Sequence, residues 1–107
     1  MATGILGTPA DLAATTNTTI YTCPSTTFTV ATVNICNRNA SSVTVRLAVA
    51  TSATPGNAEW IEYGTTIPAN AVLERSGLVL DAGKYIVAYS STTNVSVVAY
   101  GIETSTV

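Results

Sequence analysis

Short runs in which apolar and polar residues alternate recur along most of this chain. Residues 43–49 read VTVRLAV, so every second residue is a large aliphatic one. Successive side chains of a strand point to opposite faces, so this pattern indicates a strand with one buried face and one solvated face. No stretch of ten residues keeps a helical period. The chain is therefore predicted to fold from strands.

Turn-forming residues separate the predicted strands at intervals of about ten residues, which is typical of an antiparallel sandwich or barrel. The predicted strands cover residues 18–23, 27–37, 43–49, 59–63, 65–67, 71–80, 85–90 and 95–103. We predict an all-β fold, an antiparallel β-sandwich of about seven or eight short strands. The last two strands are joined by the turn-rich residues 91–94, and we predict that they form a hairpin.

The first 17 residues show neither alternation nor a sustained helical stripe. Their apolar residues Ile5, Leu6 and Leu12 are isolated among small and polar ones. We predict an extended N-terminal arm of residues 1–17, ordered against a partner, followed by a sandwich domain of residues 18–107. A short helix over residues 9–14 is an alternative, because Thr8 followed by Pro9 resembles a helix N-cap with proline at the first helical position.

The composition excludes several classes of protein. Charged residues make up only 9% of the chain, well below the roughly 25% of ordinary soluble domains. The net charge is −2 and the four basic residues are scattered, so we predict no nucleic-acid partner. No apolar run approaches the roughly 18 residues of a membrane span, so we predict no membrane partner. The N-terminus lacks a positively charged region, so we expect a protein made and used without secretion.

Side chains suited to catalysis are poorly arranged. The chain has no histidine, which removes cysteine–histidine metal sites and nucleophile pairs. Glu59 and Glu62 flank Trp60, but residues three apart on a strand point to opposite faces, so these carboxylates are not expected to converge. Cys23 and Cys36 are expected to be reduced thiols, with a disulfide as the alternative. We predict no enzyme activity, no cofactor and no metal.

Two surface features remain as candidates for binding. Trp60, Tyr85 and Tyr89 could form a glycan-binding platform, although partly buried tyrosines are routine in small β domains. The polar share of the chain is mostly Ser and Thr, which lose little side-chain entropy when they are immobilised. A surface built from such residues resembles an interface core and suggests an assembled protein. A stable monomer with a threonine-rich surface is the alternative.

The segments VNICNRNASSVTVRLAVA and AEWIEYGTTIPANAVLERSGLVLDAGKYIVAYSSTTNVSVVAYGIE resemble a family of small virion proteins of tailed bacteriophages, including phages of cyanobacteria. The resemblance covers residues 18–103 and carries over no catalytic residue. It implies a structural component of the virion that is made in the host cytoplasm. A decoration (cement) protein on the surface of the mature capsid is favoured. Its implied partners are the major capsid protein and further copies of the chain in a homotrimer.

The resemblance also gives the N-terminal residues a role. Ile5, Leu6 and Leu12 would contact the capsid or a neighbouring subunit, and deletion of residues 1–17 is expected to leave a folded domain that binds capsids weakly. A disordered tail is the alternative. The alternative function is a tail or baseplate component, or a module that binds host glycans through Trp60, Tyr85 and Tyr89.

Overall fold

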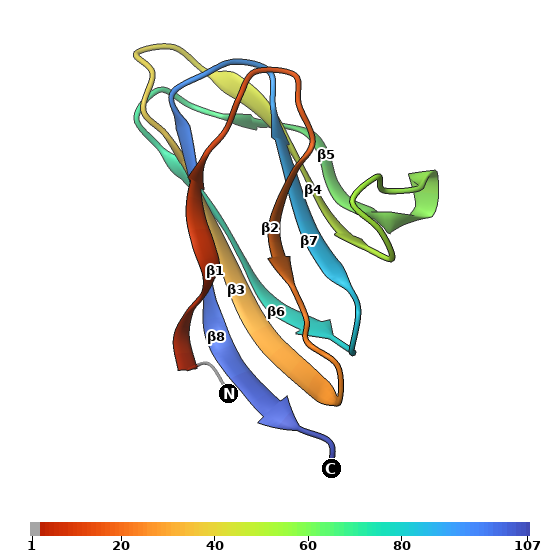
Figure 1. The fold of residues 1–107 in the computed structure, drawn as a ribbon. Helices are drawn as coiled ribbons and strands as arrows, with labels where there is room; N and C mark the ends of the chain where they lie inside the picture. Colours follow the sequence, from red (N-terminus) through yellow and green to blue (C-terminus); the bar gives the residue numbers. More distant parts are fainter. Residues whose placement is uncertain (1–2) are drawn as a thin grey trace.

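The computed structural model describes residues 3–107, and these residues form eight β-strands and one short 3₁₀ turn (Figure 1). The strands are β1 (Thr3–Asp11), β2 (Thr18–Thr22), β3 (Thr27–Asn37), β4 (Val43–Ala50), β5 (Trp60–Ile67), β6 (Val72–Leu80), β7 (Tyr85–Ser90) and β8 (Val95–Ser105), and the turn η1 (Asn57–Glu59) precedes β5. The prediction of an all-β sandwich is confirmed.

The strands form two four-stranded antiparallel sheets that pack face to face. The first sheet has the order β1-β8-β3-β6, and the second has the order β2-β7-β4-β5 (Figure 1). Four of the pairs are β1 with β8, β2 with β7, β3 with β6 and β4 with β5. The chain thus folds back on itself around the β4–β5 connection as one long hairpin, which winds into two layers. This eight-stranded topology is a jelly roll.

The predicted hairpin between residues 85–90 and 95–103 is wrong. β7 lies in the second sheet between β2 and β4, whereas β8 lies in the first sheet between β1 and β3. The connection between them crosses from one layer to the other, and Asn94 ends it with a φ of 61°. A hairpin and a crossing connection both use short turns rich in Ser and Asn, so residues 91–94 suit either.

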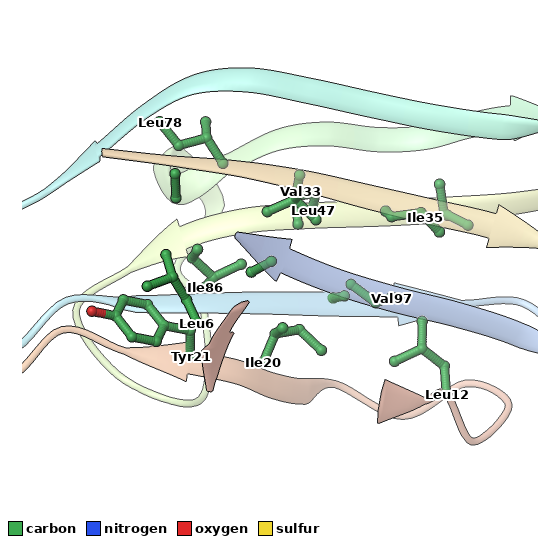
Figure 2. Packing of buried hydrophobic residues seen from close by; sticks show 14 of the residues in the cluster. Leu6, Leu12, Ile20, Tyr21, Val33, Ile35, Leu47, Leu78, Ile86 and Val97 are labelled. Atoms are coloured by element: carbon green, nitrogen blue, oxygen red, sulfur yellow. The ribbon is translucent and has the colours of Figure 1, made fainter. Parts of the chain in front are cut away.

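The structure corrects the predicted boundary between an arm of residues 1–17 and a domain of residues 18–107. Residues 3–11 form β1, which pairs with β8 as an integral strand of the first sheet. Leu6 and Leu12 are buried, and Figure 2 shows both among the core side chains. Inward-facing leucines hold this segment against the sandwich without a partner. Residues 1 and 2 lie outside the described residues.

The alternative of a helix over residues 9–14 is also wrong. Pro9 lies within β1, which is an edge strand. The register between β1 and β8 shifts between Leu6 and Ala10. Proline is tolerated in edge strands and at such irregularities, because there its missing N–H breaks no ladder of hydrogen bonds.

The remaining strand predictions agree closely with the structure, with one merger. Residues 59–63 and 65–67 were separate in the sequence pattern, but they form the single strand β5 after Glu59 has closed the turn η1. Gly64 has a φ of 71°, which a residue with a side chain rarely adopts. It lies next to a shift in the register between β4 and β5, so the strand continues through the irregularity.

The core fills the space between the two sheets with aliphatic side chains from every strand (Figure 2). The buried polar residues are Thr27, Thr29, Ser90 and Asn37. Asn37 lies at the end of β3. Its side-chain amide donates hydrogen bonds to the carbonyl oxygens of Ser41, Ile67 and Pro68. These bonds connect the end of β3 to the turns beside it. They also supply the hydrogen-bond partners that buried polar groups require. Cys23 and Cys36 are both free thiols.

Candidate functional site

The outer face of the second sheet carries a row of large side chains, which we call the aromatic face. Its members are Arg46 of β4, Trp60 and Tyr63 of β5, and Tyr85 and Tyr89 of β7. Arg46 lies opposite Tyr63 on one neighbouring strand and opposite Tyr89 on the other. The register of three strands therefore produces this cluster.

Arg46 is clamped between two rings. Its guanidinium carbon lies 4.2 Å from the centroid of the Tyr63 ring and 4.3 Å from that of the Tyr89 ring. A cation over an aromatic face is attracted by the ring quadrupole. The ion pairs found among residues 3–107 involve the other three basic residues and leave out Arg46. The positive charge is thus held by rings and has no carboxylate counterpart in the described chain.

A shallow hollow adjoins this clamp and is lined by Asn57, Trp60 and Tyr63. The rings of Trp60 and Tyr63 meet edge to face, with their centroids 5.6 Å apart and their planes at 70°. Tyr63 is 63% exposed. Trp60 packs at the sheet surface against a small cluster that includes the buried Ala48. The hollow therefore offers exposed aromatic surface on a fixed base.

The loop that leads into β5 is held by one carboxylate and projects beside the second sheet (Figure 1). Glu59 accepts hydrogen bonds from the backbone N–H of Gly56 at 2.8 Å and from that of Thr51 at 3.0 Å. The Gly56 N–H in particular holds the pKa of Glu59 below its usual value. Asn57 belongs to the turn that this carboxylate closes, so the loop is organised before any ligand arrives.

The structure brings the predicted platform residues to one face, and it adds two more. Tyr85 packs with Trp60 over the same small cluster, and Tyr89 is joined to the group through Arg46. Sequence reasoning missed Arg46 and did not single out Tyr63 from the other tyrosines of the chain. Arg46 occupies a polar position of the alternating run 43–49, so the sequence indicates that its side chain points outward. The sequence does not indicate which residues of β5 and β7 lie beside it.

The outer face of the first sheet is different and carries a second candidate surface, which we call the apolar face. It consists of Ile5, Val30, Val79, Tyr100 and Ile102, from all four strands of that sheet. Val30 lies opposite both Ile102 and Val79, and Ile5 lies opposite Tyr100. The exposed fractions run from 38% for Tyr100 to 63% for Val79. Four adjacent strands thus present apolar side chains to solvent.

Only one of the three predicted contact residues in the N-terminal segment is available for contact. Ile5 is 56% exposed and belongs to the apolar face. Leu6 and Leu12 point into the core and cannot reach a partner, which corrects their prediction as contact residues. Consecutive residues of a strand face opposite ways, so Ile5 and Leu6 could not both have been contact residues.

The carboxylates beside Trp60 have separate structural partners. Glu62 accepts hydrogen bonds from Arg75 and from the Thr65 hydroxyl, and it does not share the contacts of Glu59. Among residues 3–107 there is no group of three His, Cys, Asp or Glu side chains placed to hold a metal ion. That part of the chain also has no helix of the length and apolarity needed to cross a membrane.

One buried hydroxyl joins the two layers at the end of the core. The Tyr21 hydroxyl of β2 donates to the Glu103 carboxylate of β8 and shares a 2.8 Å hydrogen bond with the Thr29 hydroxyl. Burial and then the hydrogen bond to Glu103 raise the pKa of Tyr21 well above its usual value. This contact is structural, because it lies inside the sandwich away from both outer faces.

Comparisons of the chain with protein-family models, with curated proteins and with solved structures found no match.

Proposed function

We propose that this protein is a structural component of a tailed-phage particle, a decoration protein that binds the surface of the mature capsid through its apolar face. The observation that carries the proposal is the exposed apolar surface shared by all four strands of the first sheet. The resemblance of residues 18–103 to small virion proteins supplies the kind of particle.

The apolar face has the chemistry of a docking surface. Its members Val30, Val79 and Ile102 are β-branched and lose little side-chain entropy when they are covered. Burial of apolar surface contributes about 25 cal/mol per Å². Contiguous apolar patches on a soluble protein mark interaction sites. Ile5 keeps its predicted role as a contact residue here, now as part of a sheet.

The fold and the symmetry of a capsid suit this role. Jelly rolls occur in viral capsid proteins and also in lectins, so the topology supports the proposal by analogy alone. Binding that is specific for the mature shell would stabilise that shell by mass action. A homotrimer at the threefold positions of the capsid would multiply a modest energy per copy.

The number of copies per particle tests the proposal. Quantitative mass spectrometry of purified virions would give the ratio of this protein to the major capsid protein. A decoration protein is expected at a ratio of one to one or at a simple fraction fixed by symmetry. A handful of copies would assign it to the tail or baseplate. Absence from the particles would overturn the virion proposal.

A matched pair of variants tests the apolar face. Val79→Lys places a charge in the middle of the expected interface, and we expect it to weaken binding to capsids that lack the protein by at least tenfold, because the charge must be desolvated. Thr44→Lys adds the same charge at an exposed position of the other sheet and should bind as the parent does. Equal binding by Val79→Lys and Thr44→Lys would exclude the apolar face as the docking surface.

A further inference from the structure

We propose that the aromatic face binds an acidic saccharide, with the sugar ring against Trp60 and Tyr63 and its carboxylate on Arg46. The inference does not depend on the proposed docking to a capsid. The aromatic face belongs to the second sheet and the apolar face belongs to the first, so the two lie on opposite sides of the sandwich. Either proposal can fail while the other stands.

The hollow beside Arg46 has the components of a sugar site. The C–H groups on one side of a pyranose ring form an apolar surface that fits an exposed aromatic ring, while the hydroxyls need polar partners. Trp60 and Tyr63 supply two aromatic rings whose planes are at 70° to each other, so a sugar ring can contact both. Asn57 lines the same hollow, and its amide can both donate and accept hydrogen bonds. Aromatic side chains combined with a small number of polar groups are typical of small-molecule sites.

Arg46 determines the charge of the ligand. A guanidinium presents its N–H groups in the plane of the group. The ring centroids of Tyr63 and Tyr89 lie within 4.3 Å of the guanidinium carbon of Arg46. A carboxylate accepts two parallel hydrogen bonds from such a fork. None of the ion pairs among residues 3–107 uses Arg46, so no carboxylate of the described chain fills this position.

A polyanionic nucleic acid fits this face less well than an acidic sugar does. The net charge of the chain is −2, and phosphate backbones require several clustered basic residues. Arg46 is the single basic residue among the members of the aromatic face, which suits a ligand with one anionic group at each sugar. The rings then provide the remaining contact area.

The site is organised in advance of binding. Glu59 holds the turn that carries Asn57 through the backbone N–H groups of Gly56 and Thr51. Trp60 packs over the fully buried Ala48, so its ring rests on a fixed surface. Side chains that are already ordered lose little entropy when a ligand binds.

The first test is an array of oligosaccharides that bear uronate or sialate residues, each beside its neutral parent. We expect the protein to bind acidic members in preference to their neutral parents. The best acidic oligosaccharide and its neutral parent are then titrated, with the fluorescence of Trp60 as the signal, because it is the only tryptophan of the chain. The neutral parent is expected to bind at least tenfold more weakly, and high salt should weaken the acidic ligand selectively.

Variants identify the residues responsible. Arg46→Gln is expected to raise the Kd for the acidic oligosaccharide at least tenfold. Arg46→Lys keeps the charge but loses the planar fork, so it should also weaken binding. Arg38→Gln removes an arginine that is paired with Asp11 outside this face and serves as the matched control. Thermal denaturation shows which variants fold.

Two results would overturn the proposal. One is an array in which no acidic oligosaccharide binds better than its neutral parent. The other is a folded Arg46 variant that binds the acidic ligand as tightly as the parent protein does. If Arg46→Gln fails to fold, the titration of Arg46→Lys decides by the same criterion. The capsid proposal is judged separately, by Val79→Lys.

Discussion

Replacement of Leu6 by alanine tests whether the N-terminal strand is part of the core. Leu6 is fully buried between the two sheets. Truncation of a buried leucine to alanine costs about 3 to 5 kcal/mol, because it removes apolar contacts and leaves a cavity. A domain of this size is stabilised by about 5 to 15 kcal/mol in total. The variant should therefore lose a large share of its free energy of unfolding.

Its neighbour Ile5 provides a matched control. Ile5 is 56% exposed on the outer face of the same strand, so Ile5→Ala removes a similar side chain with little change in buried area and should cost under about 1 kcal/mol. Both variants can be unfolded in urea with the fluorescence of Trp60 as the signal. Since 1 kcal/mol shifts the Tm of a small domain by about 4 to 8 °C, Leu6→Ala should melt more than about 12 °C below the parent.

The same reasoning changes the expected outcome of an N-terminal deletion. Removal of residues 1–17 was predicted from the sequence to leave a folded domain. In the structure it would delete Leu6 and Leu12 from the core and expose the edge of β8. We expect a truncated chain that lacks cooperative unfolding and aggregates through that edge. Equal stability of Leu6→Ala and Ile5→Ala, or a cooperatively folded truncation, would refute the assignment of β1 to the core.

Two further perturbations probe specific contacts. A Cβ atom added at Gly101 would lie 2.0 Å from the carbonyl oxygen of Val30. Gly101→Ala should therefore lower the free energy of unfolding in urea by about 3 kcal/mol or more. At Gly56 the nearest atom to an added Cβ lies 3.7 Å away, so Gly56→Ala should cost under about 1 kcal/mol. The pKa of Tyr21 is raised in the folded state by burial and by its bond to Glu103, so its contribution to stability is complete below pH 10 and is lost as the pH rises above that value. The free energy of unfolding should fall more steeply above pH 10 in the parent than in Tyr21→Phe, and parallel pH profiles would contradict this assignment.

Local sequence patterns predicted most strands well, because the apolar residues of these strands follow the positions that are buried. β3 and β7 have the predicted bounds. Burial alternates along β3, where apolar and polar residues alternate, and it is nearly continuous along β7, where apolar residues follow one another. The segment Thr3–Asp11 escaped prediction for a physical reason. On its outer side it exposes Ile5 together with glycine and small residues, and only Leu6 is fully buried within it. One buried residue in an edge strand with a register shift leaves no readable period.

Neither sheet membership nor the site could be derived from local pattern. A turn such as residues 91–94 fits a hairpin within a sheet and a crossing between sheets equally well, because alternation is the same in both. The cluster around Arg46 depends on pairing across β5, β4 and β7, which joins residues far apart in the sequence. Tyr85 and Tyr89 were placed on one face correctly because they belong to one strand. Their relation to Trp60 required the sheet order.

Capsid docking and saccharide binding can both occur on one particle, because they use opposite faces of the sandwich. A protein that docks through the apolar face of the first sheet would turn the second sheet away from the capsid, since the sheets are opposite layers of the sandwich. Arg46 and the rings around it would then point outward, where an acidic saccharide of a cell surface could reach them. This orientation requires that Val79→Lys weaken capsid binding without changing saccharide affinity, and that Arg46→Gln do the reverse. A variant on either face that impaired both activities while it remained folded would show that the two surfaces are not independent.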